Sequence, residues 1–493
     1  MAVETAEGLT LAPKAVGGHA ERSGRLGLGT LTAYGAGSLV QDVTNFALNN
    51  LLLFYLTIVC GLSGSAAGIA LGVALVLDSF VDPLVGSLSD NSRSRHGRRH
   101  PWMLASAVPL VMALVMLFSV PPALSGVGLF AYALAALLAL RIGMSCFTVP
   151  FTALGAELSD DYAERSTIVA SRVLFSVLAG LVGAFLAYGV FLKGPGGLMH
   201  RGSYSPFALS CGALVLMGAA ASTLGTLRAR DRLHAAPVAD GAGIGRFAAE
   251  VVEVFRNPSF RILFFSCLIL FISLGVAASL GLHANTFFWK LKSQAILQIT
   301  QVYFAGILGG VFVAAFLGRH LEKRYIALAG ISMLGLCQLV PVSLAVTGLV
   351  PRSASVSMLT LSSTLSGVGA SFALIGFQSM MADAADEHEH LFGARREGLY
   401  FAGISLSAKA SSGIGALIAG LLLDIIGFPH GLVATSAPAR VIPLDAIRNL
   451  GLIYGPGAAV ITGLSVAMLL RYRRGRVDHD LVRESLARRR QAH

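Results

Sequence analysis

Long apolar stretches, separated by short polar segments, divide the chain almost from end to end. Each has about 20 residues or more, enough for an α-helix to cross a hydrocarbon core roughly 30 Å thick. The ten-residue alternating segments of a membrane β-barrel are absent from the sequence. The pattern therefore predicts an all-α membrane protein with twelve transmembrane helices. These predicted spans are residues 28–60, 64–90, 102–122, 125–156, 165–194, 204–227, 259–289, 295–318, 325–350, 354–384, 396–428 and 449–474.

The composition agrees with this pattern, since 55% of the residues are hydrophobic and 13% are charged. That balance excludes an ordinary soluble protein. The five cysteines lie inside or at the edges of predicted spans without metal-ligand spacing, so we interpret them as small apolar packing residues. The sequence contains no GxxxxGK[ST] loop for ATP, and residues 1–25 lack the compact apolar core of a cleaved signal peptide.

The longest polar interruption, residues 228–258, falls after the sixth span and divides the spans into two sets of six. A weak internal sequence repeat supports two related halves: GSLSDNSRSRHGRR follows the second span, and its degenerate counterpart GRHLEKR follows the eighth. Repeated halves are typical of secondary transporters, in which the halves rock around a site near the membrane midplane. We predict a tail over 1–25, a six-helix bundle over 26–227, a cytoplasmic linker over 228–258, a second bundle over 259–474 and a basic tail over 475–493.

The basic residues predict the orientation in the membrane. The net charge is +11, but most Lys and Arg residues lie in the segments between the spans. They do not form the single surface stripe expected of a nucleic-acid-binding protein. If the N-terminus is cytoplasmic, 27 of the 37 Lys and Arg lie on that side, seven in the outer loops and three within spans. The positive-inside rule then places both termini in the cytoplasm.

Ionisable side chains within the spans are candidate functional groups, because burying them in a membrane is costly. Asp78 and Asp82 are four residues apart, so their carboxylates share one helix face and are suited to capture Na+, Li+ or H+. The alternative is that they accept hydrogen bonds or pair with cytoplasmic arginines as a latch. Lys409 lies among small residues and needs an acidic partner or backbone carbonyls; pairing with Asp78 or Asp82 would let it compete with the cation.

Asp42 and Arg172 are the remaining polar pair best suited to a substrate. A carboxylate and a guanidinium together can hydrogen-bond several hydroxyl groups, which suits a polyol or a sugar. A plain salt bridge between helices is the alternative. Arg141 is interpreted as a structural residue unless it lines the cavity.

Several motifs resemble one family of transporters. They are DSFVDPLVGSLSDNSRSRHGRRHPW (78–102), AYG (33–35), CFTVPFTALGAELSDDYAER (146–165), ADAAD (382–386) and RREGLY (395–400). Together they resemble the glycoside/pentoside/hexuronide:cation symporter family of the major facilitator superfamily, which includes the melibiose carrier. The resemblance implies two pseudo-symmetric six-helix bundles around a midplane site.

By that resemblance, Asp78 and Asp82 match the cation-site carboxylates, which would be metal ligands if the ion is Na+. Lys409 matches the lysine that approaches them, and Ser145 falls where a hydroxyl often lies near the cation. Asp42 and Arg172 match the residues that hold sugar hydroxyls. The residues that match the cytoplasmic gating network are Arg93, Arg95, Arg165, Asp383, Asp386, Arg395 and Glu397.

Three departures from the family pattern bear on the ion and the substrate. Val81 stands where the melibiose carrier has an asparagine, and the lost oxygen ligand favours H+ over Na+. Thr148 and Thr152, in the candidate substrate site, replace an aspartate and a tryptophan of sugar-binding members, which argues against melibiose-like galactosides.

The combined expectation is a monomeric symporter of the cytoplasmic (inner) membrane that couples H+ or Na+ to a sugar or glycoside, without a further cofactor or a nucleic-acid partner. A transporter of a lysolipid or another amphiphile is the first alternative, and a non-transporting membrane sensor is the second. The sensor is disfavoured because the intramembrane charges are kept. An enzyme is not expected, because His283, His388 and His390 form no recognisable metal set with the acids.

Overall fold

The protein is described here by a computed structural model. The structure describes residues 26–92, 94–95, 97–159, 161–194, 196–227, 244–349, 351, 354–393, 396–433, 442–472, 484–485 and 488. Within these residues every regular element is helical. Arg93, Arg395, residues 1–25 and most of the predicted linker and basic tail lie outside the described residues.

The helices of the first half, residues 26–227, form one bundle. They are α1 (Leu28–Ala36), α2 (Ser38–Ala47), η1 (Leu48–Leu52), η2 (Tyr55–Val59), α3 (Gly64–Asp90), α4 (His100–Phe118), α5 (Gly126–Glu157), α6 (Tyr162–Ala184), η3 (Phe185–Phe191), η4 (Gly197–Met199), η5 (Arg201–Ser203) and α7 (Tyr204–Leu227). The segments η1, η2 and η3 are π-helical, and η4 and η5 are short 3-10 turns.

The helices of the second half, residues 258–472, form the other bundle. They are α9 (Pro258–His283), η7 (Ala284–Phe288), α10 (Ser293–Leu317), α11 (Lys323–Val346), α12 (Ser355–Phe392), α13 (Glu397–Ile425), α14 (Leu444–Leu452), η9 (Ile453–Gly457) and α15 (Ala458–Leu469). The segments η7 and η9 are again π-helical. Between the halves lies α8 (Ile244–Arg256), inside the predicted linker.

Eleven helical segments among the described residues are long and apolar enough to cross a membrane. The remaining predicted span, 28–60, consists of the consecutive segments α1, α2, η1 and η2. The prediction of an all-α fold with twelve spans is therefore confirmed. One boundary differs clearly: α12 continues beyond the predicted end at residue 384 to Phe392, because its polar end, DAADEHEH (383–390), can stay helical outside the hydrocarbon core.

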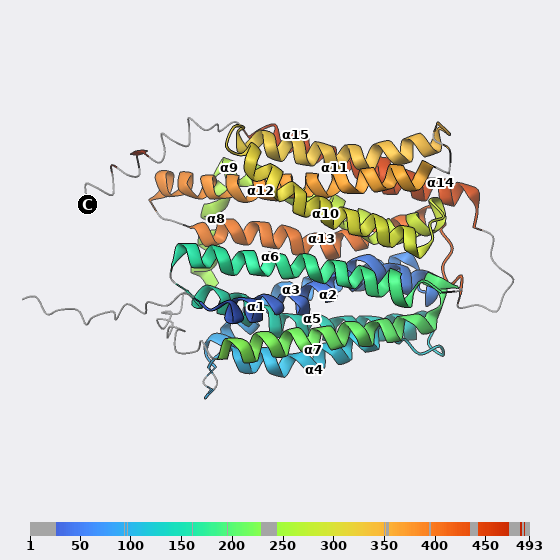
Figure 1. The fold of residues 1–493 in the computed structure, drawn as a ribbon, viewed down its shortest axis with the longest axis horizontal. Coiled ribbons are helices and arrows are strands. Elements are labelled where there is room, and N and C mark those ends of the chain that lie inside the picture. Colours follow the sequence, from blue (N-terminus) through green and yellow to red (C-terminus); the bar gives the residue numbers. More distant parts are fainter. Residues whose placement is uncertain are drawn as a thin grey trace, which may run out of the picture.

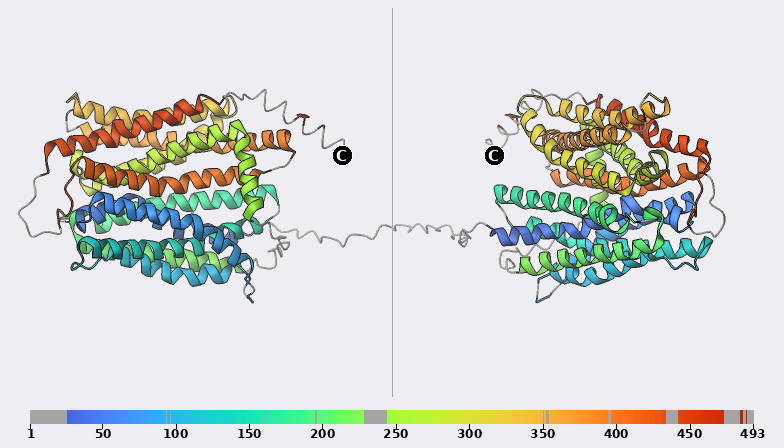
Figure 2. Two further views of the ribbon diagram at one scale, coloured as in Figure 1. Left: turned by 180° about the vertical axis from the view of Figure 1, so that it is seen from behind. Right: turned by 45° about the vertical axis from the view of Figure 1, so that its right-hand side comes forward.

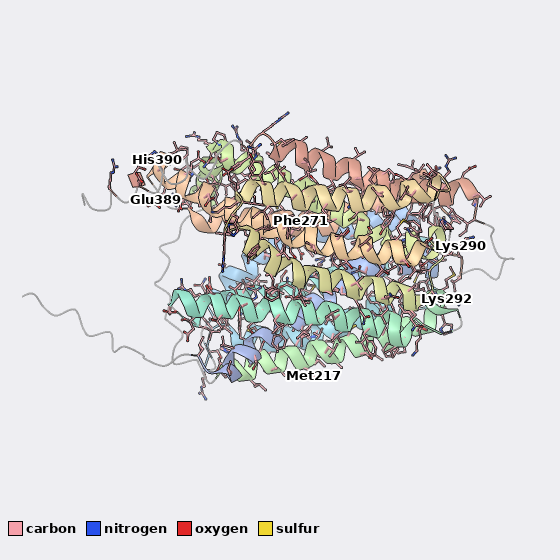
Figure 3. The ribbon with its side chains drawn as sticks, turned by 45° about the horizontal axis from the view of Figure 1, so that its top comes forward. Met217, Phe271, Lys290, Lys292, Glu389 and His390 are labelled. Atoms are coloured by element: carbon pink, nitrogen blue, oxygen red, sulfur yellow. The ribbon has the colours of Figure 1, made fainter. Side chains whose placement is uncertain are left out.

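The two halves lie side by side, with their long helices roughly parallel to one another (Figure 1). We name the end where the described chain begins and α15 finishes the terminal face, and the opposite end the distal face. Glu389 and His390 lie at the terminal face, and Lys290 and Lys292 lie at the distal face (Figure 3). The helix α8 runs across the helix ends at the terminal face (Figure 2).

The halves are joined tightly on the distal side by α3 and α13. Gly64 and Gly68 of α3 face Gly420 and Leu417 of α13, where an added Cβ at Gly68 would meet the Leu417 carbonyl at 3.0 Å. The Asp424 carboxylate of α13 accepts hydrogen bonds from the backbone N–H groups of Gly64 (2.9 Å) and Ser65 (2.8 Å). Since these are the first N–H groups of α3, one half caps a helix of the other.

Apolar and aromatic side chains complete this distal contact. The Thr57 hydroxyl lies 3.0 Å from His283 Nε2, so a buried hydrogen bond also joins the halves. The rings of Phe54 and Phe287 stack at 6.1 Å, and Phe287 contacts Phe428 at 5.2 Å.

At the terminal face, none of the ion pairs between described residues joins the first half to the second, and Arg396 binds Glu250 of the intervening helix α8 at 2.9 Å. Glu157 of α5 accepts from Arg98 (2.7 Å) and Arg99 (2.6 Å), both before α4. In the second half, Lys323 donates to Asp383 at 2.7 Å. The described polar contacts between the halves thus lie on the distal side and along α3 and α13, an arrangement that fits a site reached from the terminal face.

Candidate functional site

An ion pair connects the two halves where α3 and α13 begin to separate toward the terminal face. The Lys409 ammonium of α13 donates to the Asp82 carboxylate of α3. Small neighbours allow this approach, because Gly413, one turn further along α13, packs against Leu75 of α3. The Lys409 side chain is 45% exposed and the Asp82 side chain is 24% exposed, so the protein does not fully enclose the pair.

Asp78, one turn before Asp82, pairs with an arginine of its own half. Asp78 Oδ2 lies 3.3 Å from Nη1 of Arg141 on α5, and both residues are buried, with 5% and 7% exposure. A buried carboxylate without a counter-charge would be strongly unfavourable. Arg141 is thus the charge partner of the predicted cation-site residue Asp78, a contact that agrees with a structural role.

The four side chains form one cluster of two carboxylates and two cationic groups. One oxygen of each carboxylate, Asp78 Oδ1 and Asp82 Oδ1, is buried and accepts no hydrogen bond from any described residue. These oxygens can accept a proton or a small cation. Ser145 is buried one turn after Arg141 on the same face of α5, so its hydroxyl lies on the face that carries the arginine.

The fit of this cluster to a metal ion is poor. Both carboxylates already have a positively charged partner from the chain, and Val81 between them offers no side-chain oxygen. Na+ needs several oxygen ligands, whereas a proton needs one. Among the described residues there is no group of three or more His, Cys, Asp or Glu side chains placed to hold a metal.

The second pair of candidate residues, Asp42 and Arg172, lies on α2 and α6. The Ser176 hydroxyl, one turn after Arg172, donates to the Asp42 carboxylate. Asp42 and Arg172 are near enough for their charges to interact, yet among the described ion pairs they are not joined directly. The plain salt bridge between helices is therefore not what the structure shows, and both charged groups can still bind a ligand.

Aromatic rings support the Arg172 guanidinium. Its central carbon lies 5.3 Å from the centroid of the Phe151 ring, a cation–π contact. Phe151 in turn stacks on Tyr34 at 4.7 Å, and the Tyr34 hydroxyl donates to the Phe151 carbonyl (3.3 Å). Gly155 makes room for this tyrosine, because a Cβ there would overlap the Tyr34 hydroxyl.

Thr148 and Thr152 continue the same face of α5 toward the terminal face. They follow Arg141 by seven and eleven residues, so the four residues Arg141, Ser145, Thr148 and Thr152 form one stripe. Thr148 is half-buried and Thr152 is exposed. The stripe connects the charge cluster around Asp78 with the region of Phe151 and Arg172.

The predicted gating network is described only in part. Arg165 Nε donates to the Ser159 carbonyl at 2.7 Å, and Asp383 binds Lys323. Arg95 is exposed, and Asp386 half-buried near the end of α12. Arg93 and Arg395 lie outside the described residues, as does the side chain of Glu397, so a network between the halves stays a prediction.

Sequence reasoning missed four contributors to these sites. Ser176, Tyr34 and Phe151 act as partners of Asp42 and Arg172, and Glu157 binds the arginines before α4. A signal for Ser176 was available, because it lies one turn after Arg172 on the same helix face. Tyr34 and Phe151 lie within the motifs AYG and CFTVPFTALGAELSDDYAER, but nothing in the sequence pairs them with Arg172, since aromatic residues are common in every apolar span.

Comparisons with known proteins all match this chain to transporters. The profile of the MFS/sugar transport protein family matches residues 33–475. An uncharacterized symporter of Synechocystis sp. is 26% identical over 94% of this chain and 97% of its own length. The isoprimeverose transporter of Lactiplantibacillus pentosus is 22% identical, covering 91% of this chain and 89% of its own.

A relative with a different cargo matches equally broadly. The sphingosine-1-phosphate transporter MFSD2B of Mus musculus is 25% identical, over 92% of this chain and 91% of its own. Among solved structures, a D-xylose-proton symporter superimposes with a TM-score of 0.61 at 14% identity, covering 90% of this chain and 97% of that one. This last likeness shows the shared fold.

Proposed function

The chain belongs to the MFS/sugar transport protein family, and from that premise we propose that it is a symporter that couples cation movement to transport of a sugar or glycoside. Its relatives are transporters and not enzymes, and the protein is a multi-pass membrane protein. One observation carries the proposal of coupling: Lys409 of one half binds Asp82 of the other at the point where an incoming cation would compete with the ammonium.

We propose H+ as the coupling ion. A proton that binds Asp82 removes the charge that attracts Lys409, so the link between the halves weakens without any rearrangement of ligands. Asp78 meanwhile remains in contact with Arg141 at 3.3 Å. A Na+ ion would instead have to displace Lys409 and find further oxygens, which Val81 does not supply.

We propose that the substrate binds near Asp42 and Arg172. The carboxylate accepts hydrogen bonds from hydroxyl groups, and the guanidinium donates to them. Phe151 and Tyr34 hold the guanidinium plane in place, which reduces the conformational entropy lost on binding. The Thr148 and Thr152 hydroxyls would add contacts on the neighbouring face of α5.

An amphiphile is the second candidate substrate, favoured by two observations. A relative that is 25% identical over 92% of this chain is named as a sphingosine-1-phosphate transporter. Thr148 and Thr152 also replace the carboxylate and the ring that sugar-binding members carry. In such a substrate, Arg172 would bind an anionic headgroup.

The proposed location is the cytoplasmic membrane, with the terminal face in the cytoplasm. The excess of Lys and Arg on that face supports this orientation through the positive-inside rule. The protein would work as a monomer, because both proposed sites are built within one chain.

Uptake into liposomes tests the proposal. Purified protein would be given labelled neutral sugars, methyl glycosides or lysophosphatidylcholine, with an imposed pH gradient, an imposed Na+ gradient, or neither. We expect a sugar or glycoside to accumulate with the pH gradient. Accumulation with Na+ alone would overturn the choice of ion, and transport of the lysolipid without any sugar would establish the second candidate.

A further inference from the structure

A cavity of about 270 Å³ lies between the halves on their distal side, apart from both sites described above. Asn50 of η1 and Tyr188 of η3 line it from the first half. The other lining residues come from the second half, from α9 to α12 and from η9. Asn50 follows Asp42 by eight residues, which is about 12 Å along a helix at 1.5 Å per residue. The cavity is therefore distinct from the Asp42–Arg172 region.

Four separate π-helical segments each contribute a polar or aromatic side chain to this cavity. They are η1 with Asn50, η3 with Tyr188, η7 with Asn285 and η9 with Tyr454. π-helical turns are rare and frequently occur at functional sites, because the extra residue redirects the side chains around it. Their convergence from both halves on one cavity indicates a built binding site.

The lining chemistry suits an uncharged ligand, since no Asp, Glu, Lys, Arg or His is among the described residues that line the cavity. Gln338 of α11 is held in one orientation: the Thr462 hydroxyl donates to its Oε1 at 2.9 Å, and Thr462 lies 2.8 Å from the Ser273 hydroxyl. With Oε1 fixed toward Thr462, the amide nitrogen of Gln338 is directed away from Thr462 and can donate to a ligand.

Trp289 provides a second polar group at the cavity wall. The residue is 9% exposed, and no described residue accepts a hydrogen bond from its indole N–H. Its ring is fixed by an edge contact with Phe288 at 4.9 Å. A buried indole N–H normally has an acceptor, so a ligand oxygen would satisfy it.

We propose that this cavity binds a neutral sugar ring. Amide groups, hydroxyl groups and the aromatic residues Trp289 and Tyr454 line the cavity and match the hydroxyl groups and the apolar faces of a sugar. An acyl chain would leave the Gln338 amide and the indole N–H without partners, which is costly in a dry site. The volume of about 270 Å³ is slightly below the roughly 300–1,000 Å³ of drug-sized ligand sites, and so fits one ring. The inference rests on the proposed sugar transport and adds to it a second, uncharged subsite.

Fluorescence of Trp289 offers a direct test, because the chain has two tryptophans, Trp102 and Trp289. In a Trp102→Phe protein, purified into nanodiscs without any ion gradient, neutral methyl hexosides and methyl pentosides would be titrated against tryptophan emission. We expect a saturable change whose apparent affinity falls about three- to tenfold in Gln338→Leu, the loss of one neutral hydrogen bond. The matched control is Gln298→Leu, an exposed glutamine of α10 outside the cavity, which should not change the affinity.

A second variant provides an independent test in case the Gln338→Leu protein does not fold. Asn285→Ala should weaken binding of a radiolabelled methyl glycoside in the otherwise unchanged chain, measured by equilibrium dialysis. If neither variant weakens glycoside binding while Asp42→Asn does, the sugar binds elsewhere and the inference is wrong, although the proposed function survives. A Trp289 response to lysophosphatidylcholine but to no glycoside would also overturn it. Absence of gradient-driven uptake, with glycoside binding intact, would instead refute the proposed coupling alone.

Discussion

Lys409 of α13 and Asp82 of α3 form an ion pair that joins the two halves of the protein. Both groups are partly exposed, so the pair itself adds little stability and can exchange its partners. In the proposed mechanism the pair acts through competition: a cation that binds Asp82 would release Lys409. The first prediction concerns this competition.

Replacing Asp82 by asparagine should abolish cation-dependent uptake. The amide cannot bind a proton in the relevant pH range and no longer attracts Lys409, so the gradient has no group on which to act. We expect accumulation to fall at least tenfold, while exchange of substrate down its own gradient persists. Asp445→Asn, an exposed carboxylate of α14, is the matched control and should keep full uptake. If Asp82→Asn still accumulates substrate with a pH gradient, Asp82 is not the coupling site.

Replacing Arg141 by methionine should destabilise the protein. The change leaves the buried Asp78 carboxylate without its partner at 3.3 Å, and breaking a buried pair from one side costs about 3–5 kcal/mol. The midpoint temperature of thermal unfolding should fall clearly. Adding Asp78→Asn to Arg141→Met should restore part of the lost stability, because no unpaired buried charge then remains. Arg471→Met, at an exposed position two residues after the end of α15, serves as control. Equal, additive losses from the two changes would show that Arg141 and Asp78 do not stabilise each other.

The sequence allowed the spans, the two halves and the candidate charges to be predicted, because apolar length and intramembrane charge are local signals. It also indicated that Lys409 needs an acid, and the structure places Asp82 there. The pairing of Arg141 with Asp78 could not be predicted, since it depends on how α5 packs against α3. The π-helical segments could not be predicted either. An apolar run such as 28–60 shows the same pattern of hydrophobic residues whether it forms a continuous α-helix or contains π-helical turns. The roles of these residues in transport stay predictions.

Replacing Asp424 by asparagine should weaken the contact between the two halves on the distal side. The carboxylate of Asp424 caps the first N–H groups of α3 from the other half, with bonds of 2.9 and 2.8 Å. An amide accepts with one oxygen and without charge, so the contact between the halves weakens by about 1 kcal/mol. The fraction of molecules whose halves are separated at the distal face should therefore rise.

Distances between spin labels measure this shift. Labels at Val127 and Leu349, two exposed residues near the distal face in opposite halves, would be introduced in a cysteine-free background. We expect a longer distance to gain population in Asp424→Asn and not in Asp445→Asn, which is also near the distal face. An unchanged distribution would show that the glycine contacts between α3 and α13 hold this side closed without the cap.

Replacing Gly155 by alanine should weaken substrate binding through Tyr34. The new Cβ would overlap the Tyr34 hydroxyl, so the tyrosine must leave its position against Phe151, and the ring beneath Arg172 loses its support. Overpacking of this kind costs about 1–3 kcal/mol. We expect the KM for uptake to rise while the dependence on the pH gradient is kept, because the Asp82–Lys409 pair is untouched. Gly128→Ala, on the same helix and with ordinary contact distances, should change neither. A loss of coupling with an unchanged KM would mean that the aromatic support of Arg172 serves the ion site and not the substrate.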